Sequence, residues 1–388
     1  MRYVMADAIS RLDLSLDAIA GLFHPPEQII SIEMLGSGNV NDTFLVTLAA
    51  NADCQAFVMQ RLNTNVFEKP ELVMRNLLAL GTHVQQRLAS NPPELAGRRW
   101  EIPKVLQTRD AKDHWVECNG EFWRSISFIG EATTSDVISD AEHAQEVGYG
   151  LGMFHHLISD LPVSDLEDTV EGFHITPIYL DRYDAVLDQQ AERLSDHLLK
   201  DARVKGAIAF IESRRKDVDI LEAASERGEL QRRPIHGDPK INNVMLDQFS
   251  GLAVGLIDLD TVKPGLVHYD IGDCLRSCCN SLGEETLEIE SVTFDLDLCR
   301  AILEGYLTMG RSFLTKQDFR YLPDCIRLIP FELGLRFLTD YLEGDHYFKT
   351  ERPSQNLDRA LVQFALTHSI ESQWDELQLV IHELSGEV

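Results

Sequence analysis

Short runs of β-branched and aromatic residues, separated by polar turns, fill most of the first third of the chain. Runs of this kind are typical of strands. One stretch differs, because from Pro70 to about Ser90 the apolar residues recur at helical spacing, which predicts a helix that begins at a proline. We therefore expect a β-rich unit with one main helix. Its predicted strands are 28–35, 42–48, 56–62, 104–108, 114–118 and 122–129.

From residue 140 the pattern changes to long amphipathic segments, interrupted by one compact β-like island over 233–261. A chain of 388 residues is also too long for one small core. Together these features predict an α+β fold with two lobes: a β-rich N-terminal lobe over 1–129 and a mainly helical C-terminal lobe over 130–388. The predicted helices of the second lobe are 141–158, 178–199, 204–224, 298–309, 319–341 and 356–371.

Charge excludes some classes of partner. The chain has 35 basic and 63 acidic residues, a formal net charge of -28, which would repel nucleic acid and the anionic face of a membrane. The first 22 residues carry scattered Asp and Arg, so they resemble neither a signal peptide nor a membrane span. We expect a cytoplasmic protein that acts on a small molecule, and the sequence leaves its oligomeric state open.

The cysteines point to a reducing compartment. Their number, seven, is odd, and they are too scattered to suggest a disulfide framework. Cys274, Cys278 and Cys279 cluster in an apolar, helical context without histidines at metal spacing. We interpret them as buried thiols, with a zinc site as the alternative.

The island contains the residues that suggest chemistry. His236, Asp238 and Asn243 have the H-x-D-x-x-x-x-N spacing of a kinase catalytic loop, in which the aspartate accepts the substrate hydroxyl proton and the asparagine holds a metal ion. The predicted strand 253–257 then ends at Asp258, where a kinase places its second metal ligand. We therefore predict Asp238 as catalytic base and Asn243 and Asp258 as Mg²⁺ ligands. The alternative is a turn, a helix cap and a loop acid.

These residues lie in segments that resemble a known family. Residues 235–246 and 255–276 resemble the aminoglycoside phosphotransferase and choline kinase superfamily, and within it the N-acetylhexosamine 1-kinase branch. The similarity extends to 36–45, 57–67 and 331–348. It implies a protein-kinase-like two-lobed fold and a nucleotide-binding N-terminal lobe. It also implies Mg²⁺-dependent transfer of the γ-phosphoryl group of ATP, with GTP as an alternative, to the anomeric hydroxyl of an N-acetylated hexosamine.

The expected nucleotide site begins at a glycine-rich turn. Asn41 stands where protein kinases have the third glycine, so a plain hairpin turn is the alternative to a phosphate cover. Arg61 replaces the usual strand lysine, and Glu71 is its nearest partner, although the helix dipole alone would favour a glutamate there. The hinge is expected at 125–129. The predicted nucleotide-binding residues are Gly36, Ser37, Gly38, Asn39, Arg61, Glu71 and Phe128.

For the acceptor, besides Asp238, we expect Arg336 and Asp340, which lie one helical turn apart; an ion pair between them is the alternative. Asp270, Asp273 and Arg276 are expected to brace the metal loop rather than to touch substrate, and His155 and His156 to serve helix packing or to lie on the surface. Two rival functions remain. One is a kinase of another small alcohol, such as choline, homoserine, methylthioribose or an aminoglycoside, and the other is a nucleotide-binding pseudokinase.

Overall fold

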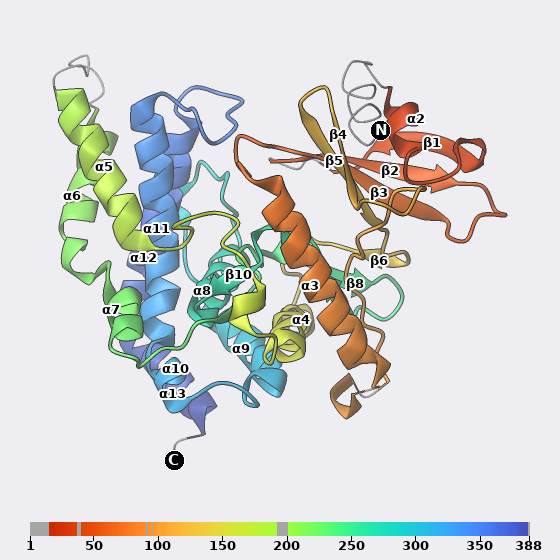
Figure 1. The fold of residues 1–388 in the computed structure, drawn as a ribbon. Helices are drawn as coiled ribbons and strands as arrows, with labels where there is room; N and C mark the ends of the chain where they lie inside the picture. The colour runs from red at the N-terminus through yellow and green to blue at the C-terminus, as the bar shows by residue number, and fades with distance from the viewer. Residues whose placement is uncertain (1–14, 37–39, 91, 96, 192–200, 387–388) are drawn as a thin grey trace. The chain divides into compact units, whose positions relative to one another are not determined.

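The computed structural model describes residues 15–36, 40–90, 92–95, 97–191 and 201–386. The chain divides into two compact units (Figure 1). The first runs to Glu131 and takes in two later segments, 164–170 and 260–263; the second contains 132–163, 171–259 and 264–388. Among the described residues, no helix combines the length and the apolar composition that crossing a bilayer requires.

The first unit is built on a five-stranded antiparallel sheet with the order β1-β2-β3-β5-β4. Two of the expected strands, 42–48 and 56–62, match β2 and β3 residue for residue. The strand expected at 104–108 forms only an isolated bridge between Val105 and Ile126. The elements are α2 (Leu16–Ala20), β1 (Ile29–Met34), β2 (Asp42–Leu48), β3 (Ala56–Leu62), α3 (Pro70–Ala89), β4 (Trp115–Cys118) and β5 (Glu121–Ser127).

The two faces of this sheet have different roles. Side chains alternate between faces along a strand, so every second residue of β3 points the same way. Phe57 and Met59 are fully buried and pack with Trp123 of β5 against Ile19 of α2. Arg61 follows in the same alternation and lies over the Trp123 ring at 5.9 Å. Gln60 points to the opposite face of the sheet, where it accepts hydrogen bonds from another residue of β5.

The second unit is mainly helical, and its helices α5, α8 and α12 pack against α11 (Figure 1). The helix expected at 141–158 matches α4 in both bounds. Two other expected helices are each divided in two. The helix expected at 204–224 is interrupted by the turn Arg215–Asp217. The helix expected at 319–341 is interrupted at Tyr321, just before Pro323 in the first turn of α11. The described helices are α4 (Ala141–Ile158), α5 (Thr176–Ala191), α6 (Ala202–Glu212), α7 (Ile220–Glu226), α8 (Val267–Cys278), α9 (Leu296–Gly310), α10 (Lys316–Arg320), α11 (Leu322–Glu343), α12 (Gln355–Ser372) and α13 (Trp374–Ser385).

Short strands lie between these helices along the chain, and some of them form the β-like island over 233–261. The order of the three-stranded sheet is β6-β8-β9, and both of its pairs are antiparallel. The three clustered cysteines, Cys274, Cys278 and Cys279, are buried free thiols, as the apolar context predicts. The strands are β6 (Ala132–Thr133), β7 (Arg233–Ile235), β8 (Val244–Asp247), β9 (Ala253–Leu256) and β10 (Lys263–Gly265), the last of which starts at the final residue of the first unit.

Candidate active site

One buried carboxylate holds the backbone of the loop between β7 and β8. Asp270, in the first turn of α8, accepts hydrogen bonds from the backbone N–H groups of His236 at 2.6 Å and Gly237 at 2.8 Å. Gly237 has a φ of +89°, a conformation that a side chain would strain. This backbone path places Asp238 at the turn of the loop.

His155 fixes Asp270 itself and is held in turn by Tyr306. His155 of α4 lies 2.8 Å from the carboxylate of Asp270 and 2.9 Å from the hydroxyl of Tyr306. Burial opposes ionisation of Asp270, but the hydrogen bond from His155 and the nearby His236 outweigh it, so the pKa of Asp270 lies below its ordinary value. His155 is therefore a packed helix residue, as expected, and it also supports the loop through Asp270.

Asp238 forms an ion pair that the sequence motif did not include. The Nζ atom of Lys240 lies 2.9 Å from Asp238 Oδ2, and both side chains are partly exposed. The negative charge of Asp238, with a smaller contribution from Asp258, raises the pKa of Lys240. The ammonium therefore stays charged. The signal for this pair in the sequence is a basic residue two positions after the predicted base.

Asn243 and Asp258 are brought together by backbone contacts. Asn243 donates from Nδ2 to the carbonyl oxygen of Asp238 at 2.7 Å, which turns its amide oxygen away from that contact. The backbone N–H of Ile257 donates to the carbonyl oxygen of Asn243 at 2.9 Å, and His236 Nε2 lies 3.0 Å from the carbonyl oxygen of Ile257. Asp258 follows with a φ of +62°, a left-handed conformation that is uncommon outside glycine and often found at functional sites.

The oxygen donors at this place fit Mg²⁺ in chemical type. Mg²⁺ takes hard oxygen ligands and is often held by one or two carboxylates together with substrate phosphates. The amide oxygen of Asn243 and the carboxylate of Asp258 are such ligands. Within the described ranges, no group of three or more His, Cys, Asp or Glu side chains could hold a metal alone. Asn243 and Asp258 could thus hold Mg²⁺ with ligands from a bound nucleotide.

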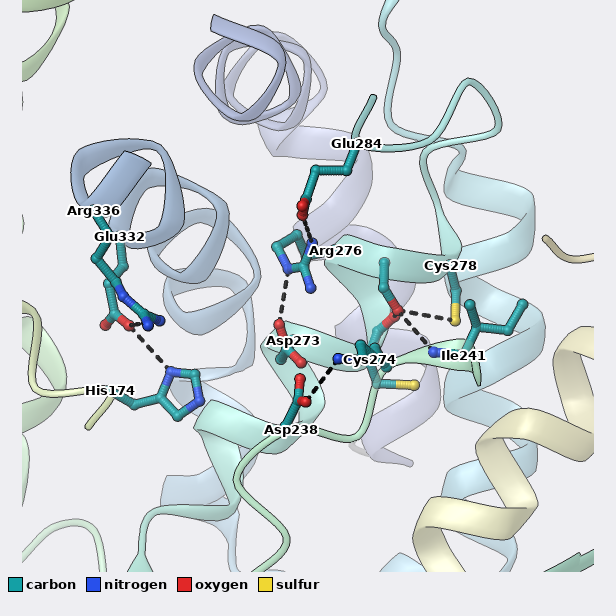
Figure 2. Close-up of polar contacts among 12 residues, drawn as sticks. His174, Asp238, Ile241, Asp273, Cys274, Arg276, Cys278, Glu284, Glu332 and Arg336 are labelled. Carbon is teal, nitrogen blue, oxygen red and sulfur yellow. Dashed lines mark hydrogen bonds and ion pairs between the residues drawn. The ribbon is translucent and has the colours of Figure 1, made fainter. Parts of the chain in front are cut away.

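A second charged cluster lies along α8. Arg276 Nε donates to Asp273 Oδ1 at 2.8 Å, and its Nη1 donates to Glu284 at 3.1 Å (Figure 2). Asp273 is only 4% exposed, and its Oδ2 atom has no hydrogen-bond partner among the described residues. Asp270 braces the backbone of the predicted loop, whereas the contacts of Asp273 run to Arg276.

His174 connects the loop with α11. Its Nε2 lies 2.7 Å from the carbonyl oxygen of Gly237, and its Nδ1 lies 3.1 Å from the carboxylate of Glu332 (Figure 2). Burial opposes protonation of His174, but Glu332 outweighs it and raises the pKa of the imidazole. No sequence motif marks His174, and the contact with Gly237 spans 63 residues.

The two residues predicted for the acceptor have different surroundings. Arg336 lies 4.0 Å from Glu332 in an ion pair one helical turn away. Asp340 accepts from the backbone N–H groups of 346–348 at 2.8–3.0 Å and from Asn356 Nδ2 at 3.0 Å. The alternative of an Arg336–Asp340 ion pair is thus corrected. The reason is that the segment after α11 turns back and saturates the Asp340 carboxylate with N–H donors.

In the first unit, the contacts of Arg61 differ from those expected. It donates from Nε to Asp42 at 2.8 Å and also pairs with Glu121, and no contact with Glu71 occurs among the described residues. The cause is strand alternation, which places Arg61 on the face that packs against α2. Glu71 lies in the first turn of α3, directly after Pro70, where the helix dipole favours it.

The opposite face of the sheet carries a buried cation that the sequence did not reveal. Arg124 of β5 donates to Gln60 at 2.7 and 3.0 Å and forms an ion pair with Asp260 at 2.5 Å, with both charged side chains 2% exposed. Asn41 donates to the same Asp260 at 2.8 Å and accepts from the N–H of Asn63 at 2.9 Å. The asparagine at the place of the third glycine therefore ties the turn to the segment 260–263.

Two of the remaining predicted residues, Gly36 and Phe128, lie shortly after the ends of strands. Gly36 follows β1 with a φ of +73°, and a Cβ there would meet nothing within 4 Å. Phe128 follows β5 and is 37% exposed. Ser37, Gly38 and Asn39 lie outside the described residues.

The chain matches one known protein family, and its fold is similar to that of several solved structures. Residues 31–301 match the model of the phosphotransferase enzyme family. The structure is similar to an aminoglycoside phosphotransferase from Alicyclobacillus acidocaldarius, with 16% identity, a TM-score of 0.61, and coverage of 96% of this chain and 98% of that chain. It is also similar to an ethanolamine kinase from Plasmodium vivax, with 12% identity, a TM-score of 0.56, and 94% and 95% coverage. A choline kinase from Cryptosporidium parvum is similar as well, with 13% identity, a TM-score of 0.56, and coverage of 93% of each chain.

At these identities, the solved structures show the fold and not the activity. They confirm the kinase-like α+β fold class, with one β-rich and one mainly helical part. The family match covers well over half of the sequence and includes the loop, Asp258 and Asp273. The chain therefore belongs to the phosphotransferase enzyme family.

Proposed function

We propose that this chain is a small-molecule kinase that transfers the γ-phosphoryl group of ATP to a hydroxyl group. The leading acceptor is the anomeric hydroxyl of an N-acetylated hexosamine. The observation that carries the proposal is the loop around Asp238, which presents one partly exposed carboxylate beside Lys240, with Asn243 and Asp258 joined to it by backbone contacts.

In this proposal Asp238 is the general base. It accepts the proton of the acceptor hydroxyl as the oxygen attacks phosphorus. Lys240 orients the carboxylate from 2.9 Å and keeps it paired before the acceptor arrives. Mg²⁺, when held by Asn243 and Asp258 with the nucleotide phosphates, would neutralise the charge that develops on them. Retention of the base and both oxygen ligands argues against a pseudokinase.

The nucleotide is assigned to the first unit by the resemblance of its segments 36–45 and 57–67. Phe128, just after β5, would mark the adenine side. Arg61 is already matched by Asp42 and Glu121, so a direct phosphate contact would require it to exchange a carboxylate for a phosphate. The proposed nucleotide-binding residues are Gly36, Ser37, Gly38, Asn39, Arg61, Glu71 and Phe128.

For the acceptor, Arg336 is proposed as a direct contact. Asp340 would act indirectly, because its carboxylate already holds residues 346–348. The assignment to N-acetylhexosamines rests on the resemblance of 255–276 and 331–348, and the kinases of other small alcohols remain competitors.

The test is ADP formation by the purified protein with ATP and Mg²⁺. The acceptor panel contains N-acetylglucosamine, N-acetylgalactosamine, choline, homoserine, methylthioribose and kanamycin. Rapid ADP formation with the two N-acetylated sugars and a sugar 1-phosphate product by ³¹P NMR support the proposal. Transfer to another member with the sugars silent would reject the acceptor, and nucleotide binding without transfer to any member would reject this kinase assignment.

A further inference from the structure

Asp260 joins three parts of the first unit. Its Oδ1 forms an ion pair at 2.5 Å with Arg124 of β5, and its Oδ2 accepts from the side-chain amide of Asn41, directly before β2, at 2.8 Å. Thr169 donates to its backbone carbonyl oxygen at 3.1 Å. Both carboxylate oxygens are therefore engaged within the protein, and the side chain is only 2% exposed.

The segment that begins at Asp260 is also anchored by α3. Asn76 is 1% exposed, donates to the carbonyl oxygen of Val262 at 2.8 Å and accepts from the backbone N–H of Glu167 at 2.8 Å. Asp258, the proposed metal ligand, precedes Asp260 by two residues. Two residues of chain span at most about 7 Å. Whatever fixes Asp260 therefore limits where the carboxylate of Asp258 can lie.

Stability alone is a poor explanation for the ion pair between Arg124 and Asp260. Both side chains are 2% exposed, and Nη1 of Arg124 has no hydrogen-bond partner among the described residues. Taking two charges out of water is costly, and well-packed apolar residues of similar size often stabilise a fold as much. A buried pair with a spare donor points instead to a role in placing the groups around it.

Those groups belong to the sheet and to the glycine-rich turn. Gln60 of β3 accepts from Arg124 at 2.7 and 3.0 Å and donates to Thr43 of β2 at 3.1 Å. The buried guanidinium thus connects three strands of the sheet with Asp260. Asn41 adds the end of the turn, because its amide binds the second oxygen of the same carboxylate.

We infer that Arg124 and Asn41 are positioning residues, which act through Asp260 to couple Mg²⁺ binding at Asp258 to nucleotide binding by the first unit. The inference rests on the proposed function, which supplies the nucleotide and the metal. It assigns the organising ion pair to the face of the sheet opposite Arg61. Because such coupling is reciprocal, nucleotide and Mg²⁺ raise each other's affinity by the same factor.

The deciding measurement is the binding of the non-hydrolysable ATP analogue AMP-PNP by isothermal titration calorimetry, once with Mg²⁺ and once with EDTA. The factor by which Mg²⁺ strengthens binding reports the coupling and requires no acceptor. In Asn41→Ala this factor should fall by about 10-fold, because Mg²⁺ requires near-octahedral geometry and Asp258 is then less well placed. Asn51→Ala, at an exposed position between β2 and β3, is the control and should keep the wild-type factor.

A double variant separates positioning from stability. Arg124→Met combined with Asp260→Leu replaces the buried pair by apolar side chains, so the thermal unfolding midpoint should stay near that of the wild type. The Mg²⁺ factor should nevertheless fall by about 10-fold or more. A lower midpoint with an unchanged Mg²⁺ factor would mean that the pair only holds the fold, and the inference would be wrong. If the double variant does not fold, Asn41→Ala decides.

Failure of the kinase proposal gives a different result. If Mg²⁺ strengthens AMP-PNP binding to the wild type but no acceptor is phosphorylated, the kinase proposal fails and the variants still judge the inference. An unchanged factor in Asn41→Ala overturns the inference, even where affinity falls equally with Mg²⁺ and with EDTA, because Asn41 then only shapes the turn. A wild type on which Mg²⁺ has no effect overturns it as well.

Discussion

The side-chain amide of Asn243 donates to the carbonyl oxygen of Asp238 at 2.7 Å, across five residues of the loop. This bond uses the nitrogen of the amide and leaves its oxygen as the group that can face a cation. One contact therefore has two effects, because it fixes the backbone behind the proposed base and orients a proposed metal ligand.

Asn243→Ala should raise the Mg²⁺ concentration needed for half-maximal activity by about 10- to 100-fold, because it removes one oxygen ligand. The measurement is ADP formation across a Mg²⁺ titration. Asn242→Ala is the control, since Asn242 is the exposed neighbour in the same short 3-10 helix. An unchanged Mg²⁺ requirement in Asn243→Ala would exclude Asn243 as a ligand.

Asp238→Asn should lower kcat by about 10²- to 10⁴-fold while leaving nucleotide affinity nearly unchanged, because the amide has no carboxylate to accept the hydroxyl proton. Single-turnover kinetics and isothermal titration with nucleotide measure the two effects. Asp188→Asn, at an exposed position of α5, is the control. Wild-type turnover in Asp238→Asn would show that Asp238 is not the base.

Asp270→Asn should lower the free energy of unfolding at pH 7 by about 1–3 kcal/mol, because an amide cannot accept from the N–H groups of His236 and Gly237 and from His155 together. The folded-state pKa of Asp270 lies below its ordinary value of 3.8. Its stabilising effect is therefore complete above that value and is lost as the pH falls through the folded-state pKa.

Urea unfolding at pH 7 and the midpoint of acid unfolding measure these two consequences. Asp181→Asn, at an exposed position of α5 beyond its first turn, should change neither. An unfolding free energy of Asp270→Asn equal to that of the wild type would show that the three donors find other acceptors.

Local patterns in the sequence predicted the elements with strong periodicity and the spacing of the loop. Strands 42–48 and 56–62 and helix 141–158 match the structure residue for residue, because alternation and helical spacing are written into consecutive residues. The roles of Asp238, Asn243 and Asp258 came from a motif, and they remain predictions.

What the sequence could not supply depends on contacts between distant residues. Arg61 was assigned from its position along β3, but the face on which it lies depends on which side of the sheet packs against α2. Arg124 meets Asp260, and His174 meets Gly237, only after the chain has folded back. A single sequence contains no periodicity that links such pairs, and so these contacts were missed.

Glu222→Gln should make stability less dependent on pH. Burial raises the pKa of Glu222 to about 7, although the hydroxyl of Tyr269 donates to it at 2.7 Å. Between its ordinary value of 4.5 and 7 the folded protein holds this proton and the unfolded chain does not, so stability falls as the pH rises through that window. The glutamine keeps the acceptor oxygen and removes the titration.

Chemical unfolding at pH 5 and pH 7.5 measures the effect. The stability of Glu222→Gln relative to the wild type should increase from the lower to the higher pH. Glu226→Gln, at an exposed position of the same helix α7, should follow the wild type at both values. A constant difference between Glu222→Gln and the wild type would show that Glu222 does not titrate in this window.

Gly305→Ala should destabilise the helical unit by about 3 kcal/mol, because α9 and α4 pack backbone against backbone at this residue. A Cβ on Gly305 would lie 1.9 Å from the carbonyl oxygen of Gln145, so one helix would have to move away from the other.

Gly206→Ala is the matched control within a helix. A Cβ there meets nothing within 4 Å, and alanine should raise stability by about 0.5–1 kcal/mol through helix propensity. Thermal unfolding of both variants measures the opposite signs. A Gly305→Ala variant as stable as the wild type would mean that α4 and α9 can separate at little cost, and the close contact would then not be what holds α4, and with it His155, against the loop.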